Sequence, residues 1–168
     1  EESIRELYIQ INDSLKEKSE YEIIFIDDGS SDNSKKNIKA LINQDSNVRL
    51  ISFYRNFGKS AALSEGFKHV SGDIIITMDA DLQDDPNEIT NLINKLNEGF
   101  DLVSGWKKKR HDPWTKTLPS KVFNFVTRLL TGVKIHDFNC GLKAYKLKVV
   151  KTLNIYGGLH RFIPALAK

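Results

Sequence analysis

The chain alternates between short apolar runs rich in β-branched residues and longer stretches with helical spacing. The apolar runs have the length and composition of strands, at residues 21–26, 48–53, 73–78 and 101–105. The longer stretches predict helices at residues 4–16, 34–43, 59–70 and 86–97. Strands and helices that alternate in this order form mostly parallel sheets. We therefore expect an α/β fold with a mostly parallel central sheet flanked by helices.

A further helix is expected after residue 120, where apolar side chains recur at intervals of three and four. Its apolar face comprises Val122, Phe123, Val126, Leu129, Leu130 and Val133. Such a face packs into the core, contacts a second copy of the chain, or lies on a membrane surface. The pattern by itself leaves these three interpretations open.

The length of 168 residues and the hydrophobic content of 40% fit a single domain. Because the chain begins with a predicted helix and ends without a turn, we expect the domain, residues 1–168, to lack a first strand and a C-terminal continuation. The single cysteine, Cys140, has no partner for an internal disulfide, which favours a reducing, cytoplasmic compartment. No run of about 18 apolar residues is present, so this segment itself is expected to be soluble.

The charge is distributed unevenly along the chain. Residues 1–100 contain 11 Lys and Arg against 19 Asp and Glu, whereas residues 101–168 contain 14 against 3. An acidic first half suits a cation site. A basic second half suits a phosphorylated ligand, an anionic membrane or a nucleic acid, although solvated surface lysines would give the same count.

Two neighbouring acids, Asp27 and Asp28, directly follow the apolar run at 23–26. In open α/β sheets ligands gather beyond the carboxyl ends of the strands, so this turn is a candidate site for a base or a ribose. The alternative is structural, with Asp27 and Ser30 satisfying backbone N–H groups of the turn.

A second acidic turn follows the apolar run at 74–76 and contains Asp79, Asp81 and Gln83. Two carboxylates two residues apart, with an amide oxygen nearby, are hard oxygen ligands suited to Mg or Mn, and they leave positions for phosphate oxygens. The alternative is an acidic turn that caps the next helix. Pro86 fits the first turn of that helix, and the acids before it are good caps.

Between these turns, Gly58 precedes a predicted helix that begins at Lys59, with Arg55 just upstream. The two basic side chains and the free N–H groups of a helix start have the right charge to hold a diphosphate. The spacing is neither that of a Walker loop nor that of a G-x-G-x-x-G dinucleotide loop, which argues against ATPases of that kind and nicotinamide enzymes.

Four segments together resemble family 2 glycosyltransferases in order and spacing: Asp27-Asp28-Gly29-Ser30, Arg55-Asn56-Phe57-Gly58-Lys59, Asp79-Ala80-Asp81-Leu82-Gln83 and Asp137-Phe138-Asn139-Cys140-Gly141-Leu142-Lys143. Within that family the chain looks most like the polyprenyl-phosphate sugar transferases, over nearly its whole length. The resemblance implies a GT-A fold, a UDP- or GDP-sugar donor, a divalent metal and inversion at the anomeric carbon. It departs from the family pattern at Leu142, where phenylalanine is commoner, and in having no membrane helices behind it.

The resemblance also implies roles for individual residues. Asp28 would contact the nucleotide base, Arg55 and Lys59 would neighbour the donor, and Arg110 and Ser120 would contact the acceptor phosphate. Asp79, Asp81 and Gln83 would form the metal and diphosphate site, with Asp79 and Asp81 taking part in catalysis. We place Lys107 with the acceptor-binding residues.

The acceptor decides whether a general base is needed. A phosphate monoester is already anionic at neutral pH, whereas a hydroxyl must lose a proton. The basic excess after residue 100 favours a polyprenyl phosphate acceptor. Asp137 keeps the hydroxyl alternative open, because it is either a catalytic base or a cap of the turn at Asn139. That alternative corresponds to a transferase that elongates a surface polysaccharide.

Two other classes compete with an enzyme: a nucleotide-binding module without catalysis and a nucleic-acid binder. RNA-binding aromatic motifs are missing and the acidic strand ends repel a phosphate chain, so no nucleic acid is expected. The basic run from Lys107 to Arg110, followed by an apolar helix, suits an anionic membrane surface, which places the protein at the inner face of the membrane. A homo-oligomer through the apolar helix remains open.

Overall fold

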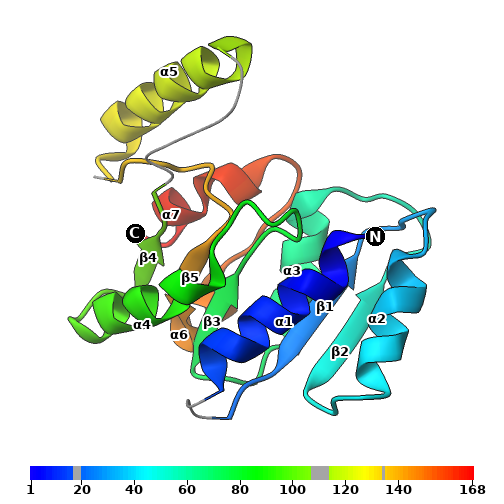
Figure 1. The fold of residues 1–168 in the computed structure, drawn as a ribbon. Helices are drawn as coiled ribbons and strands as arrows, with labels where there is room; N and C mark the ends of the chain where they lie inside the picture. Colours follow the sequence, from blue (N-terminus) through cyan, green and yellow to red (C-terminus); the bar gives the residue numbers. More distant parts are fainter. Residues whose placement is uncertain (17–19, 107–113, 134) are drawn as a thin grey trace.

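The computed structural model describes residues 1–16, 20–106, 114–133 and 135–168, with the side chains of helix α5 described from Phe123 onward. Along the chain the elements are α1 (Ser3–Leu15), β1 (Ile23–Asp27), α2 (Ser34–Ile42), β2 (Val48–Ser52), α3 (Lys59–His69), β3 (Ile74–Thr77), η1 (Pro86–Glu88), α4 (Ile89–Asn97), β4 (Leu102–Ser104), α5 (Trp114–Thr131), β5 (Lys143–Lys146), α6 (Leu147–Thr152), η2 (Leu159–Phe162) and α7 (Ile163–Leu166) (Figure 1).

The strands form two sheets within the described residues. β1 and β2 pair in parallel, with Ile23 opposite Val48 and Asp27 opposite Ser52. In the second sheet β5 lies between β3 and β4 and is antiparallel to both. The α/β prediction is confirmed, and all four predicted strands exist within two residues of their expected bounds. The antiparallel strand β5 was not predicted.

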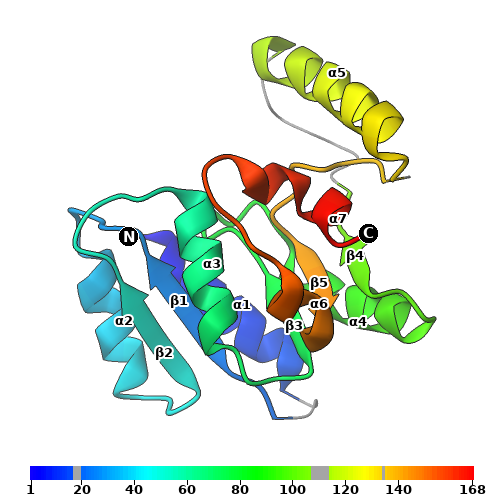
Figure 2. The same cartoon turned by 180° about the vertical axis from the view of Figure 1, so that it is seen from behind.

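Helices cover both faces of these sheets. α1, α2 and α4 lie on one face, as Figure 1 shows, and α3 and α6 lie on the other, which faces the viewer in Figure 2. Buried apolar clusters fill the space between them. One joins α1 and α2 to β1 and β2 through Ile4, Phe25, Ile38, Leu41 and Val48. Another packs α4 against β5 through Leu92, Leu96 and Ala144. In a third, residues of α3 and α6 pack against Tyr145 of β5.

The helix predicted at 86–97 begins with a 3-10 turn, η1, and continues as α4. Asp85 caps it, since its Oδ1 accepts a hydrogen bond from the backbone N–H of Asn87 at 2.9 Å. Pro86 occupies the first turn, where its missing N–H costs nothing. The predicted cap is confirmed, and it fixes where the acidic loop before α4 must end.

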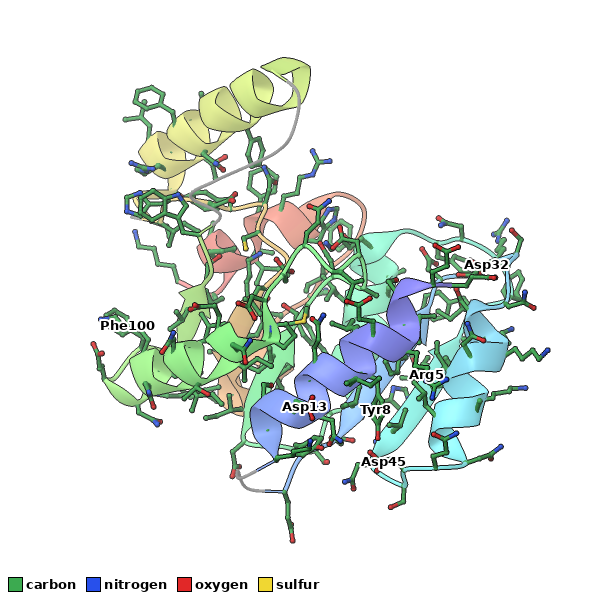
Figure 3. The ribbon with its side chains drawn as sticks, viewed as in Figure 1. Arg5, Tyr8, Asp13, Asp32, Asp45 and Phe100 are labelled. Atoms are coloured by element: carbon green, nitrogen blue, oxygen red, sulfur yellow. The ribbon has the colours of Figure 1, made fainter. Side chains whose placement is uncertain are left out.

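The N-terminal helix α1 is tied to two loops. The hydroxyl of Tyr8 donates to Asp45 Oδ2 at 2.9 Å, and Figure 3 shows the two side chains facing each other. At the other end of the helix, the hydroxyl of Ser3 donates to the backbone carbonyl oxygen of Ala80 at 2.6 Å. Ala80 lies between the two aspartates of the acidic loop, so α1 supports the loop that the sequence singles out.

Helix α5 stands apart from the sheets in both views (Figures 1 and 2). Its contacts with the rest of the molecule include two buried polar residues, Asn124 and Thr127, and Asn124 Oδ1 accepts from the backbone N–H of Phe138 at 3.2 Å. The ring of Phe123 also packs edge-on against that of Phe162, with 5.3 Å between the ring centroids. Its apolar residues Phe125, Val126, Leu129 and Leu130 are 65%, 43%, 74% and 79% exposed. The interpretation of this face as core is therefore wrong for Val126, Leu129 and Leu130.

Within the described ranges, none of the helices combines the length and apolar character needed to cross a lipid bilayer.

Candidate functional site

Asp27 and Asp28 sit at the carboxyl end of β1, as predicted, but their environments differ. Asp27 is buried, and its two carboxylate oxygens accept hydrogen bonds from Ser30 N at 3.1 Å and from Ser52 Oγ at 2.9 Å. Burial raises the pKa of Asp27, but these hydrogen bonds outweigh it and hold the pKa below its usual value. Asp27 thus joins the ends of β1 and β2 and supports the turn that carries Asp28.

Asp28 clamps the loop that leads into α3. Its Oδ1 accepts from Phe57 N at 2.7 Å, and its Oδ2 accepts from Gly58 N at 2.8 Å. Gly29 allows this loop to approach, because it has φ +74° and a Cβ there would lie 2.4 Å from the backbone of Arg55. The first two sequence segments of the predicted site are therefore in direct contact.

The two predicted basic residues have different partners. The guanidinium of Arg55 lies over the ring of Phe57, 4.9 Å from its centroid, on the surface of the loop. Lys59, the first residue of α3, reaches across to β3, and its Nζ lies 2.5 Å from Asp79 Oδ1. The ion pair brings the N-terminus of α3 together with the acidic loop.

The acidic loop after β3 is tightly constrained around Asp79. Leu82 has φ +61°, which is rare for a side-chain-bearing residue and is found where surrounding contacts impose it. Gly141, from the segment before β5, lies so close that a Cβ there would be 2.5 Å from Asp79 Oδ2. The fourth sequence segment thus packs directly on the acid of the third.

The other two proposed metal ligands, Asp81 and Gln83, are not among the residues that line the cavity beside Asp79. Asp79 lines a cavity of about 660 Å³, together with Lys59 and Gly141. Asp81 is exposed and its Oδ1 accepts from Gln83 N at 3.0 Å, while Gln83 lines a separate hollow together with Gln10 of α1. In the part of the chain that the structure describes, no group of three or more His, Cys, Asp or Glu side chains is arranged to hold a metal ion.

The oxygen donors of the acidic loop nevertheless fit a divalent cation chemically. Carboxylate and amide oxygens are the ligands that Mg and Mn prefer. Asp79 already binds one cationic group, the ammonium of Lys59. A site with two carboxylates would take its remaining ligands from phosphate oxygens and water.

The other predicted catalytic acid, Asp137, is 2% exposed. Its Oδ1 accepts from Asn139 N at 3.0 Å, and it is not among the residues that line the cavity of Asp79. This is the geometry of the turn cap that the sequence left open as the alternative. Lys107 and Arg110 lie outside the described residues, and so does the side chain of Ser120 in α5.

Sequence reasoning did not assign a role to three further residues that line the same cavity as Asp79: Lys143, His160 and Arg161. Lys143 ends the sequence motif that begins at Asp137, but its burial follows from the pairing of β5, which the sequence pattern did not reveal. The short elements around His160 have no periodicity long enough to signal them. The resulting cavity combines Asp79 with several cationic groups.

Comparison with known proteins gives a consistent result. A family model described as "Glycosyl transferase family 2" matches residues 1–153. An undecaprenyl-phosphate 4-deoxy-4-formamido-L-arabinose transferase from Shewanella sediminis is 45% identical over 88% of this chain and 45% of its own length. A dodecaprenyl-phosphate galacturonate synthase from Rhizobium johnstonii is 38% identical over 86% of this chain and 44% of its own. The chain thus spans about half the length of these curated relatives.

Among solved structures, glucosyl-3-phosphoglycerate synthase from Mycobacterium tuberculosis in complex with phosphoglyceric acid superposes with a TM-score of 0.71 and 23% identity, over 91% of this chain and 55% of that one. The same enzyme in complex with Mn2+ and UDP-glucose gives a TM-score of 0.67 and 20% identity, over 91% and 54%. These likenesses establish the GT-A type of fold.

Proposed function

The chain belongs to glycosyl transferase family 2, and we propose that it transfers a sugar from a UDP- or GDP-sugar to a polyprenyl phosphate, with inversion at the anomeric carbon. The two curated relatives act, by their names, on undecaprenyl phosphate and dodecaprenyl phosphate. Because the chain spans about half of each, the acceptor is carried over as part of this proposal.

One observation carries the proposal: the ion pair between Lys59 and Asp79 at 2.5 Å, at the point where the N-terminus of α3 meets the acidic loop. A helix start offers free N–H groups and a partial positive charge, and Lys59 adds a full one. The donor's diphosphate would take the place of Asp79 as the partner of Lys59. Arg55, Asp27 and Asp28 lie at the adjoining strand ends, where the nucleoside would bind.

The proposal includes a divalent metal, Mg or Mn, held by Asp79 and Asp81 with Gln83. Such an ion, when bound, neutralises the negative charge that develops on the departing nucleotide, which lowers the activation barrier of this kind of reaction by several kcal/mol. The catalytic role of Asp79 and Asp81 would be to hold this cation, and the ammonium of Lys59 would add a second positive charge near the diphosphate. Both acids stand within one loop that α1 supports through Ser3.

A phosphate acceptor fits the described residues better than a hydroxyl. A phosphate monoester has a second pKa of about 6 and attacks as an anion without a base. The acid that would serve a hydroxyl acceptor, Asp137, is 2% exposed and caps a turn. Lys107, Arg110 and Ser120 remain our proposed contacts to the acceptor phosphate.

The exposed apolar face of α5 supports a position at the membrane. Phe125, Leu129 and Leu130 are each more than 60% exposed on one helix, and the chain from residue 101 onward carries 14 basic residues against 3 acidic ones. An apolar helix face flanked by positive charge binds anionic lipid surfaces. We place the protein at the cytoplasmic face, where nucleotide sugars and a reduced cysteine are both expected.

The direct test is sugar transfer by the full-length protein. Radiolabelled UDP- and GDP-sugars are supplied with Mn2+ to undecaprenyl phosphate in one reaction and to undecaprenol in another. We expect label in the lipid only with the phosphate, and none with the Asp81→Asn variant. Equal transfer to undecaprenol, or transfer to soluble sugar hydroxyls alone, would contradict the proposed acceptor.

Membrane contact is tested separately by sedimentation with vesicles that contain anionic phosphatidylglycerol. The double variant Leu129→Ser, Leu130→Ser should lose most of its vesicle binding. Tyr156→Ser removes a side chain that is 68% exposed outside α5, so it should bind as the unmodified protein does. If both variants sediment alike, α5 is not the membrane contact.

A further inference from the structure

The cavity of about 660 Å³ beside Asp79 has a cationic side that the proposed donor site does not use. Its walls come from α3, β3, β5 and the short elements η2 and α7, and Figure 2 shows α3 and α7 on the same side of β5. Among the charged groups in its lining, Asp79 is acidic, whereas Lys59, Lys143 and Arg161 are basic. Because Lys59 is already paired with Asp79, the other basic groups give the cavity an excess of positive charge.

Lys143 is unusual because a lysine on a central strand is only 4% exposed. Its Nζ donates to the backbone carbonyl oxygen of Cys140, which satisfies one of the three N–H donors of an ammonium group. Burial lowers the pKa of Lys143, so keeping a charge here is costly. A lysine in this position, lining a cavity, is suited to an anionic ligand that arrives from outside.

His160 also lines the cavity, and Ser60 determines how its ring is presented. Ser60 is 3% exposed in the first turn of α3. Its Oγ accepts a hydrogen bond from the backbone N–H of His160 at 3.2 Å and lies 2.9 Å from His160 Nδ1. The hydroxyl hydrogen of Ser60 can be donated to Nδ1, and in that arrangement the ring carries its proton on Nε2.

The surroundings of His160 favour the neutral form of its ring. Burial lowers the pKa of His160, and the nearby charges of Lys59 and Arg161 lower it further below its ordinary value of 6.5. With Nδ1 held by Ser60, the other ring nitrogen offers one N–H donor on the side away from α3. A neutral donor in the same cavity as Lys143 and Arg161 adds hydrogen bonding without adding to their mutual repulsion.

We propose that Lys143, His160 and Arg161 bind the phosphate oxygens of a ligand in this cavity, and that Ser60 is a positioning residue that holds His160 in its Nε2–H form. The lining also contains the apolar side chains of Leu63, Phe123, Phe138 and Ile163. A phosphate monoester with an apolar substituent matches both kinds of lining residue. That choice rests on the proposed function, since the donor's diphosphate carries the same oxygens.

The site is tested by NMR of the chain labelled with ¹⁵N-histidine, because the ring nitrogen shifts report which nitrogen carries the proton. The His160→Gln variant identifies the resonances. We expect His160 to have its proton on Nε2, and inorganic phosphate to shift its signals while leaving those of His136 in place. His136 stacks on Trp106 and is not among the cavity-lining residues. Phosphate that leaves His160 unshifted overturns the site.

Ser60→Ala tests the positioning role. It should turn the His160 signals into a mixture of both ring forms and weaken phosphate binding about 10-fold, the loss expected for one hydrogen bond to a charged group. His160→Ala should weaken it as much, and His160→Gln, which keeps an N–H donor, should recover most of the affinity. A Ser60→Ala variant that melts earlier but keeps both the ring form and the affinity shows that Ser60 is only structural.

The source of the phosphate is distinguished by two further probes. If it is the acceptor's monoester, farnesyl phosphate binds more tightly than inorganic phosphate and UDP without metal does not displace it. Displacement by UDP or GDP assigns the same oxyanion site to the donor instead. If these probes shift His160 while the full-length protein transfers no sugar to undecaprenyl phosphate, the proposed function is wrong and the phosphate site stands.

Discussion

Replacing Gly141 by alanine tests whether the close packing of the segment before β5 sets the position of Asp79. A Cβ at Gly141 would lie 2.5 Å from Asp79 Oδ2 and 2.6 Å from its Cγ. An ordinary contact between carbon and oxygen is about 3.3 Å, so the carboxylate must move by about 0.8 Å. Gly141 does not have a positive φ, so the backbone itself accepts alanine.

A displacement of about 1 Å at a reacting group costs on the order of 100-fold in rate, or about 2.7 kcal/mol. We therefore expect Gly141→Ala to lose about 100-fold in sugar transfer by the full-length protein and to bind Mn2+ with nucleotide correspondingly less well. Thermal unfolding should change little, because the clash falls on a side chain that is 36% exposed and can shift toward solvent.

Gly158→Ala is the matched control. Gly158 has φ −92°, and nothing lies within 4 Å of a Cβ placed there. It should keep the unmodified rate and affinity. A Gly141→Ala protein with normal transfer and normal metal-dependent nucleotide binding would refute the reasoning, since Asp79 would then not need the position that Gly141 allows.

Three other predictions concern stability and charge. Gly29→Ala combines a positive φ with a backbone clash at 2.4 Å, whereas Gly99→Ala has a positive φ and open space around the new Cβ. Urea unfolding should therefore show a loss of unfolding free energy of about 3 kcal/mol or more for Gly29→Ala and about 1 kcal/mol for Gly99→Ala. Equal losses would contradict the close approach at Gly29. Lys59→Met should change the unfolding free energy by no more than about 1 kcal/mol, because the ion pair of Lys59 is partly exposed. Calorimetry should show weaker binding of the nucleotide diphosphate and tighter binding of Mn2+ alone at Asp79. Tighter nucleotide binding would count against Lys59 as a donor contact. Burial raises the pKa of Asp27 but its hydrogen bonds lower it below 3.8, so its contribution to stability is complete above that pH and is lost as the pH falls through the lower, folded-state pKa. The stability difference between the unmodified chain and Asp27→Asn should therefore shrink in acid, and a difference that grows below pH 3.8 would show that the sign is wrong.

The elements up to residue 105 could be predicted because each has a local signal. β-branched runs mark the strands, and Pro86 with Asp85 marks the start of the helix that contains α4. β5 could not be predicted in the same way. Its four residues, Lys143–Lys146, carry two lysines, and they form a strand only because β3 and β4 supply hydrogen bonds on both sides. That pairing is between segments far apart in the chain.

In the candidate site, too, the residues with a local sequence signal could be predicted and those that depend on long-range packing could not. The acids and Lys59 could be found because they follow strands or begin a helix, where ligands gather. The contact of Gly141 with Asp79, and the tie between Ser60 and His160 one hundred residues later, depend on tertiary packing that leaves no periodic trace. For helix α5 the apolar spacing left three interpretations open, and the structure argues against burial in the core for Val126, Leu129 and Leu130, which are exposed, whereas the polar residues Asn124 and Thr127 are buried.

The central claim is that Asp79 and Asp81 hold a divalent cation that neutralises the nucleotide's diphosphate. The most direct measurement is electron paramagnetic resonance of Mn2+ titrated into the chain, with and without UDP or GDP. We predict that free Mn2+ signal disappears far more effectively when one nucleotide is present, and that Asp81→Asn removes this effect. Unchanged nucleotide-dependent Mn2+ binding in Asp81→Asn would contradict the account.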